Sequence, residues 1–248
     1  MFDQYLKEIK YLKMYILTAG VLLLACYSVV ILSDETTLLR LGDEDQLFEW
    51  ITCFFFASTS LFFFMSFFKT RKLLFLLLAA VFLFGAGEEF SWGQRLIGFE
   101  TPESISKINV QKEFNIHNIE IFNNKDLQGN VKQELKKLLD MNFLFKVFVM
   151  MFGILLPICV YHTKFISAIT LKLGVPVPPV SIGIFFLVSW LIYQLLSSAI
   201  FADSSNSYFA SFVEIFECAQ ASILAIISLY FFIENKTLIT GQDIKQVI

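Results

Sequence analysis

The chain has 248 residues and a formal net charge of −3; 56% of its residues are hydrophobic, 30 are phenylalanine, and the mean hydropathy is +0.68. A water-soluble domain contains about 45–50% apolar residues, so this composition excludes an ordinary soluble protein and predicts apolar surfaces that face a membrane. The slightly acidic balance also argues against a nucleic-acid partner, which would favour a basic surface.

Six apolar segments are long enough to cross a bilayer, whose hydrocarbon core of about 30 Å requires about 20 residues at about 1.5 Å each. In chain order they are Leu12–Leu32, Leu47–Phe68, Leu73–Trp92, Phe143–Val160, Val180–Phe201 and Phe209–Phe232. The sequence therefore predicts an all-α fold: a polytopic membrane bundle of six transmembrane helices that forms a single domain over residues 1–248.

Basic residues are divided unequally between the two sides of the expected bundle. The two short connections 33–46 and 202–208 contain only Arg40. The opposite side carries ten: Lys7, Lys10, Lys13, Lys69, Arg71, Lys72, Lys164, Lys172, Lys236 and Lys245. Because short cytoplasmic connections carry an excess of Lys and Arg, both termini are predicted to lie in the cytoplasm.

The many Phe, Ile, Lys and Asn residues are typical of an AT-rich bacterial genome, which favours a bacterial inner membrane.

The connection 93–142 is then an extracytoplasmic loop inserted between the third and fourth spans. Its residues 101–130 look irregular, whereas residues 131–141 have apolar side chains at helical spacing and lysines on the other face. This pattern predicts an amphipathic helix on the outer membrane surface. A shorter amphipathic helix is expected on the inner side over Phe165–Leu173, ended by Gly174.

Five glutamates lie within the expected spans, where an ionised side chain costs about 2.5–3.5 kcal/mol near the bilayer centre. They are Glu49, Glu88, Glu89, Glu214 and Glu217. Counting about 1.5 Å per residue puts Glu88 and Glu89 within about 6 Å of the outer surface and Glu217 about 12 Å below it. The glutamates of three spans therefore share the outer third of the bilayer, which marks a site there.

The charges of this site do not balance, because the nearby cations are Arg95 and, in the outer loop, His117. Either some of the five glutamates are protonated or a bound divalent cation neutralises them. Carboxylates suit Mg²⁺ or Ca²⁺, and with His117 also Mn²⁺, Fe²⁺ or Zn²⁺. A helix that continued beyond Trp92 would put Glu88 and Arg95, seven residues apart, on one face.

These residues favour a membrane-embedded enzyme at the outer leaflet, a hydrolase or transferase acting on a lipid, a lipid-linked glycan or a peptide. Glu88 or Glu89 would be the general base or a metal ligand, His117 a second acid or base, and Arg95 the group that binds an anion. The alternatives are a cation- or proton-coupled transporter and a structural subunit that binds a membrane-protein partner. Glu49 and Glu214 could instead face lipid headgroups, and His117 could be a surface histidine.

The central motif resembles an uncharacterised family of bacterial multi-span membrane proteins. The residues that carry this resemblance are Glu88-Glu89-Phe90-Ser91-Trp92-Gly93-Gln94-Arg95, Gly98-Phe99-Glu100-Thr101-Pro102, Asn115-Ile116-His117-Asn118, Glu49-Trp50 and the pair Glu214 and Glu217. The resemblance covers most of the chain and implies a shared architecture without an assigned activity.

A second, weaker resemblance is to intramembrane glutamate proteases of the CAAX-processing type. In that family a Glu-Glu pair precedes an Arg, a Phe-x-x-x-His motif and another His, and the glutamate activates water. Here Arg95 follows the glutamates at a longer spacing, Phe114 and His117 are one residue too close, and the outer side has no second histidine. The resemblance implies a glutamate-based hydrolase, and these departures separate the chain from the protease pattern.

Overall fold

The computed structural model describes residues 2–42, 46–133, 138–200 and 207–234, and for residues 2–10 and 207 it describes the backbone only. The described residues form helices and no strand, as expected. The α-helices are α1 (Phe2–Leu32), α2 (Glu35–Gly42), α3 (Leu47–Thr70), α4 (Leu73–Glu89), α5 (Gln94–Ile97), α6 (Glu103–Ser106), α7 (Met141–Met150), α8 (Leu156–His162), α9 (Lys164–Leu173), α10 (Val180–Ala199) and α11 (Ser207–Glu234).

Five helical segments of the described chain are long and apolar enough to cross a membrane, so the chain is built as a multi-pass membrane protein. They are Tyr11–Leu32, Glu35–Thr70, Met141–His162, Val180–Ala199 and Tyr208–Glu234. A sixth results if α4 and the bent segment Ser91–Ile97 are counted as one span, although the two meet at 63°.

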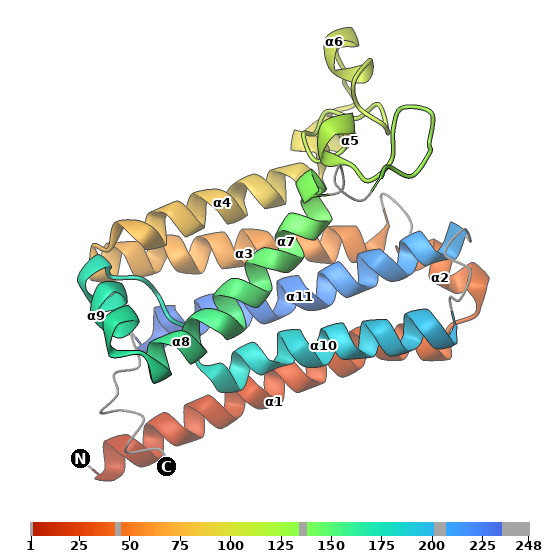
Figure 1. Cartoon of the computed structure of the whole chain (residues 1–248). Helices are drawn as coiled ribbons and strands as arrows, with labels where there is room; N and C mark the ends of the chain where they lie inside the picture. The colour runs from red at the N-terminus through yellow and green to blue at the C-terminus, as the bar shows by residue number, and fades with distance from the viewer. Residues whose placement is uncertain (1, 43–45, 134–137, 201–206, 235–248) are drawn as a thin grey trace.

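Helix α11 lies at the centre of the bundle, between α3 on one side and α1 and α10 on the other (Figure 1). In its most apolar 18-residue stretch 89% of the residues are buried, against 22–33% in the other four long segments. Three of those four segments bury one side against α11, and Met141–His162 packs mainly on α10. All four leave large apolar side chains exposed, as expected of helices that face lipid. The side chains of α11 therefore form the centre of the hydrophobic core.

The third span ends earlier than its apolar pattern predicts. The backbone turns at Ser91, Trp92 and Gly93, which all have positive φ angles of 49°, 52° and 84°. Only glycine adopts this region without strain, so the two other residues could not be recognised as a helix end from their types. The expectation of one helix face shared by Glu88 and Arg95 is therefore wrong.

The fourth span is continuous from α7 to α8 but passes through a π-helical turn at Met151–Leu155. At this turn it meets α10 very closely, since a Cβ atom placed on Gly183 would lie 1.8 Å from the carbonyl oxygen of Gly153. Two glycines thus let the two backbones touch, a packing mode common between membrane helices.

The two ends of the bundle differ (Figure 1). Helices α2, α5 and α6 lie at one end, and α9 lies at the other together with the start of α1 and the end of α11. The helix expected at Phe165–Leu173 is confirmed as α9, which ends at Gly174 with φ of 66°. The helix expected at 131–141 includes residues 134–137, which lie outside the described residues; beside them Val131 forms a bridge with Lys125, and α7 begins at Met141.

Candidate functional site

Glu88, at the end of α4, holds the outer loop onto the bundle. Its Oε2 atom accepts hydrogen bonds from the backbone N–H groups of Ile116 (2.6 Å) and His117 (2.7 Å), and its Oε1 atom accepts one from Trp92 Nε1 (2.6 Å). The residue is 4% exposed. A carboxylate with three donors is well stabilised in its ionised form, so Glu88 is an anchor for the loop more than a free base.

His117 lies beside this anchor, as the sequence predicted. Its Nδ1 atom is 3.4 Å from Glu88 Oε2, and 28% of its side chain is exposed. The outer loop therefore folds back over the end of α4. A carboxylate next to Nδ1 orients an imidazole and leaves Nε2 available for a second partner.

Arg95 binds two carboxylates, neither of which is Glu88. Its Nη1 atom donates to Glu49 Oε2 at 2.9 Å and its Nη2 atom donates to Glu113 Oε1 at 2.6 Å. The side chains of the three residues are only 12–18% exposed. This arginine therefore joins α3, α5 and the outer loop. Glu113 was missed in the sequence because it lies in an irregular loop with no periodic pattern.

Amide side chains complete the connection between the motif and the loop. Gln94 donates to Thr101 Oγ1 (2.6 Å) and accepts from the N–H of Phe114 (2.7 Å). Asn115 is 3% exposed and donates to Glu113 Oε2 at 2.7 Å and to Ser91 Oγ at 3.2 Å. The motif residues Ser91 and Gln94 thus have a structural role, because they fix the loop that carries His117.

Glu89 and Glu217 accept no hydrogen bond from the described residues of the loop. They come from α4 and α11 and lie close enough for their charges to repel each other; Glu49 and Glu88 add to the repulsion on Glu89, and Arg95 opposes it. Neither side chain accepts a hydrogen bond from the described residues, and Glu217 Oε1 is buried. Two adjacent carboxylates without donors cannot both remain ionised in a low-dielectric environment.

Lys146 is a cation of this site that sequence reasoning missed. It lies on α7, inside the fourth span, and its Nζ atom is 5.5 Å from the ring centre of Tyr193 and 5.3 Å from that of Phe216. Its charge attracts Glu217. The sequence did indicate this residue, because a lysine within an apolar span marks a candidate site as much as a glutamate does.

The five glutamates are not gathered as one set of metal ligands in the described chain. The described residues contain no group of three or more His, Cys, Asp or Glu side chains placed to hold a metal ion. Glu88 accepts hydrogen bonds from the loop, and Glu49 binds Arg95. Glu214 is half-buried and lies one turn before Glu217 on α11. A divalent cation at these glutamates stays a prediction.

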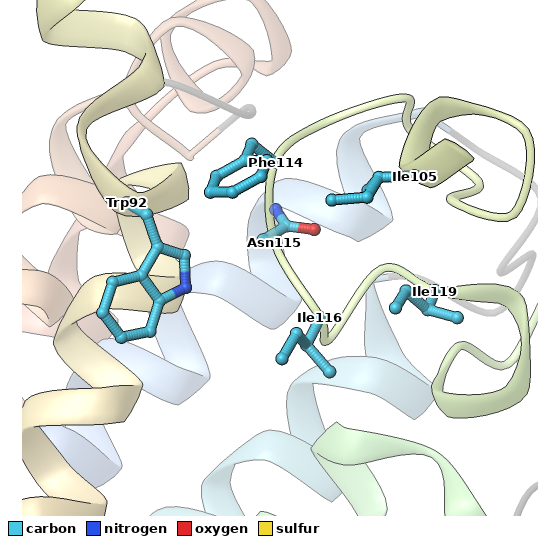
Figure 2. Close-up of a pocket in the computed structure, with 6 residues that line it drawn as sticks. All are labelled: Trp92, Ile105, Phe114, Asn115, Ile116 and Ile119. Atoms are coloured by element: carbon cyan, nitrogen blue, oxygen red, sulfur yellow. The ribbon is translucent and has the colours of Figure 1, made fainter. Parts of the chain in front are cut away.

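An apolar pocket of about 260 Å³ lies next to the anchor (Figure 2). Its lining residues are Trp92, Ile105, Phe114, Asn115, Ile116 and Ile119. Trp92 faces the loop residues across the pocket, and both it and Ile116 also bind Glu88. The only polar lining residue, Asn115, already uses its amide in the loop network. The pocket is thus lined mainly by apolar side chains, and one of its lining residues, Ile116, directly precedes His117 in the chain.

The chain was compared with protein families, with curated proteins and with solved structures, and none of them matches.

Proposed function

We propose that the protein is a membrane-embedded hydrolase or transferase in which Glu89 and Glu217 form an acid–base pair. The observation that carries this proposal is that two carboxylates from different helices, close enough for their charges to repel each other, accept no hydrogen bond from the described residues. Such a pair retains one proton between its members, so one can act as general acid and the other as general base.

In this mechanism the ionised glutamate accepts a proton from water or from a substrate hydroxyl, and the protonated one gives its proton to the leaving group. His117 is a further acid or base, oriented by Glu88 through Nδ1. Arg95 holds Glu49 and Glu113 and so positions the loop. This assigns the base to Glu89 in place of Glu88, because Glu88 already accepts three hydrogen bonds.

The proposed setting is a bacterial inner membrane crossed six times, with both termini in the cytoplasm. The sixth crossing is α4 together with its bent continuation. The basic residues near Lys72 and Lys172 support this orientation, because they lie at the α9 end of the bundle, opposite to α5 and α6. The acid–base pair would then open toward the outer leaflet.

The proposed substrate is a lipid, a lipid-linked glycan or a membrane-bound peptide. The apolar pocket beside His117 supports it, since such walls suit a hydrocarbon or an apolar side chain. Trp92, Leu96 and Ile97 are 42%, 69% and 77% exposed at the same end of the bundle, where an interfacial position would bury them in lipid headgroups.

The test is a search for product in proteoliposomes made from bacterial polar lipid extract, read by mass spectrometry after incubation with and without chelator. The wild type should convert at least one lipid or lipid-linked species, and Glu89→Gln and Glu217→Gln should lose about 10²–10⁴-fold in rate, as expected for a general acid or base. Glu103→Gln is the matched control, because Glu103 is exposed and pairs with Lys107 on the surface, away from Glu89 and Glu217. Conversion that survives both core substitutions would exclude the acid–base pair.

A second candidate function is proton-coupled transport, and one observation favours it. From Glu217 the polar side chains Gln220, Ser189 and Tyr27 continue into the bundle. Carboxylates followed by polar groups inside a membrane are typical of proton relays. Proteoliposomes with a pH-sensitive dye inside distinguish the two functions: proton entry that Glu217→Gln abolishes, without any lipid conversion, would favour transport.

A further inference from the structure

Two of the buried oxygen atoms of helix α11 that accept no hydrogen bond from the described residues are Glu217 Oε1 and Gln220 Oε1. The residues are 9% and 1% exposed. They are three positions apart, so they lie on one face of the helix, one turn from each other. An unpaired buried acceptor costs about 1–3 kcal/mol, and two on the same face require an explanation.

The hydroxyl groups near Gln220 already use their hydrogens in other hydrogen bonds. Its Nε2 atom donates to Ser189 Oγ at 2.8 Å, while the hydroxyl of Tyr27 lies 2.9 Å from the carbonyl oxygen of Ser189 and 2.8 Å from its Oγ. When Tyr27 donates to this carbonyl, the Ser189 hydroxyl donates back to Tyr27. Both hydroxyl hydrogens are then used, and Gln220 Oε1 receives none from this chain of residues.

The ionisable groups that face Glu217 come from α3, α4, α7 and the outer connection 93–142, and they include both acids and bases. The basic residues are Lys146 on α7 and His117 in the outer loop; the acidic ones are Glu49 on α3, which binds Arg95, Glu89 on α4 and Asp140 beside α7. The phenol of Tyr193 on α10 is also close. Glu217 is 9% exposed and lies about 15 Å along α11 from its start, and burial at that depth in a membrane helix favours an uncharged carboxyl.

We infer that Glu217 is protonated in the resting protein and that its carboxyl group donates this proton to the amide oxygen of Gln220. One hydrogen then satisfies Gln220 Oε1 and removes the negative charge from the buried side chain. The site is thus a binding site for a single proton, and its residues are held in place by Ser189 and Tyr27.

This inference deepens the proposed function, because it gives the two members of the pair different roles. Glu217 holds the proton and is the acid, and Glu89, which has no such acceptor beside it on its own helix, is the base. Gln220 is then a positioning residue that holds the proton of Glu217. The proton-binding site itself does not depend on any reaction, so it can be tested without a substrate.

The test is infrared spectroscopy of the full chain in lipid nanodiscs at pH 7, recorded in H₂O and in D₂O. We expect the carbonyl band of a protonated carboxyl group, which Glu217→Gln should remove and Glu103→Gln should retain. Gln220→Leu, which removes the acceptor, should move the band to higher wavenumber. Replacing choline by Na⁺ in the buffer should leave the band unchanged.

Absence of the band from the wild type, or its persistence in Glu217→Gln, would overturn the inference. Loss of the band on adding Na⁺ would mean that a metal ion occupies the site in place of the proton. If Glu217→Gln does not fold, Gln220→Leu is the deciding variant. A carbonyl band at the wild-type wavenumber in Gln220→Leu would show that Gln220 does not accept the proton. A correct band pattern without any lipid conversion would leave the proton site intact and remove only the proposed enzyme.

Discussion

Trp92 Nε1 donates to Glu88 Oε1 at 2.6 Å across the turn that ends α4, and the indole ring packs against Gly87. A backbone with positive φ at Ser91 and Trp92 brings the ring back over its own helix. The same carboxylate holds the N–H groups of two loop residues, so a local turn and a distant loop share one anchor.

Trp92→Phe should keep the ring contact but lose the hydrogen bond to Glu88. A hydrogen bond to a charged group contributes about 1.5–3 kcal/mol, and we expect a loss of stability of that size. Thermal denaturation in detergent and limited proteolysis of the outer loop would measure it. Trp50→Phe is the control, because Trp50 is half-exposed on α3. Equal stability of both variants would contradict the anchor role of Glu88.

Arg95→Met should destabilise the protein more, because it leaves two carboxylates without their cation. Breaking a buried ion pair costs about 3–5 kcal/mol, and since Glu49 and Glu113 keep some exposure we expect about 3 kcal/mol. Adding Glu113→Gln to Arg95→Met should recover part of this loss. A double-mutant cycle on the melting temperature measures the recovery, and strictly additive effects would mean that the two side chains are not coupled.

Gly183→Ala should separate α10 from the fourth span. Its Cβ atom would lie 1.8 Å from Gly153 O, so the helices must move apart, at a cost of about 3 kcal/mol or more. Gly20→Ala is the matched control, because its Cβ atom would meet Phe185 at an ordinary 3.7 Å. The fraction that remains monodisperse in gel filtration after heating compares the two variants. A Gly183→Ala protein as stable as Gly20→Ala would refute the close contact.

The outer loop should loosen at acid pH through Asp126. The N–H of Asn130 (2.8 Å) and that of Gln128 (2.9 Å) donate to its Oδ1 atom, and these hydrogen bonds, led by that from Asn130, lower the pKa of the carboxyl. Because the folded pKa is below the unfolded one, the stabilisation is complete above the unfolded pKa and is lost as pH falls through the folded one. Hydrogen-exchange protection over residues 124–132, corrected for intrinsic rates, should fall in that acid range. In Asp126→Asn the protection should not fall in this pH range. A pH profile of protection identical to that of the wild type would contradict the assignment to Asp126.

Reporter fusions test the orientation. Fusions after Lys72 and after Lys172 should report the cytoplasm, and a fusion at Asn124 should report the outside, because basic residues are retained on the cytoplasmic side. A cytoplasmic signal at Asn124 would reverse the topology and would move the acid–base pair to the inner leaflet.

The long helices could be predicted from the sequence because hydrophobicity along the chain is sufficient to locate them. The start of α3 at Leu47 and of α10 at Val180 agree with the apolar segments, and α1 ends at Leu32 as predicted. The end of α4 could not be predicted, since it depends on left-handed backbone at Ser91 and Trp92, which these residue types rarely adopt.

The sequence named candidate residues for the site, but their contacts could not be predicted from it. Sequence position put Glu88, Glu89 and Glu217 in the outer third of the expected bilayer, yet it could not tell Glu88, which receives three donors from the chain, from Glu89, which receives none in the described part. That distinction depends on the path of the loop, which follows no periodic pattern. Glu113 became part of the site for the same reason.

The central position of α11 has a consequence for how the chain is assembled. The ribosome makes α11 after the helices that surround it, α1, α3 and α10, so these enter the membrane before the surface on which they pack exists. Until α11 is made, Phe63 and Phe75 lack their contact with Phe231, and Tyr15 lacks its contact with Tyr230. Completion of the bundle therefore follows synthesis of its last described helix, and a nascent chain that stops before Ser207 lacks both the centre of the core and Glu217.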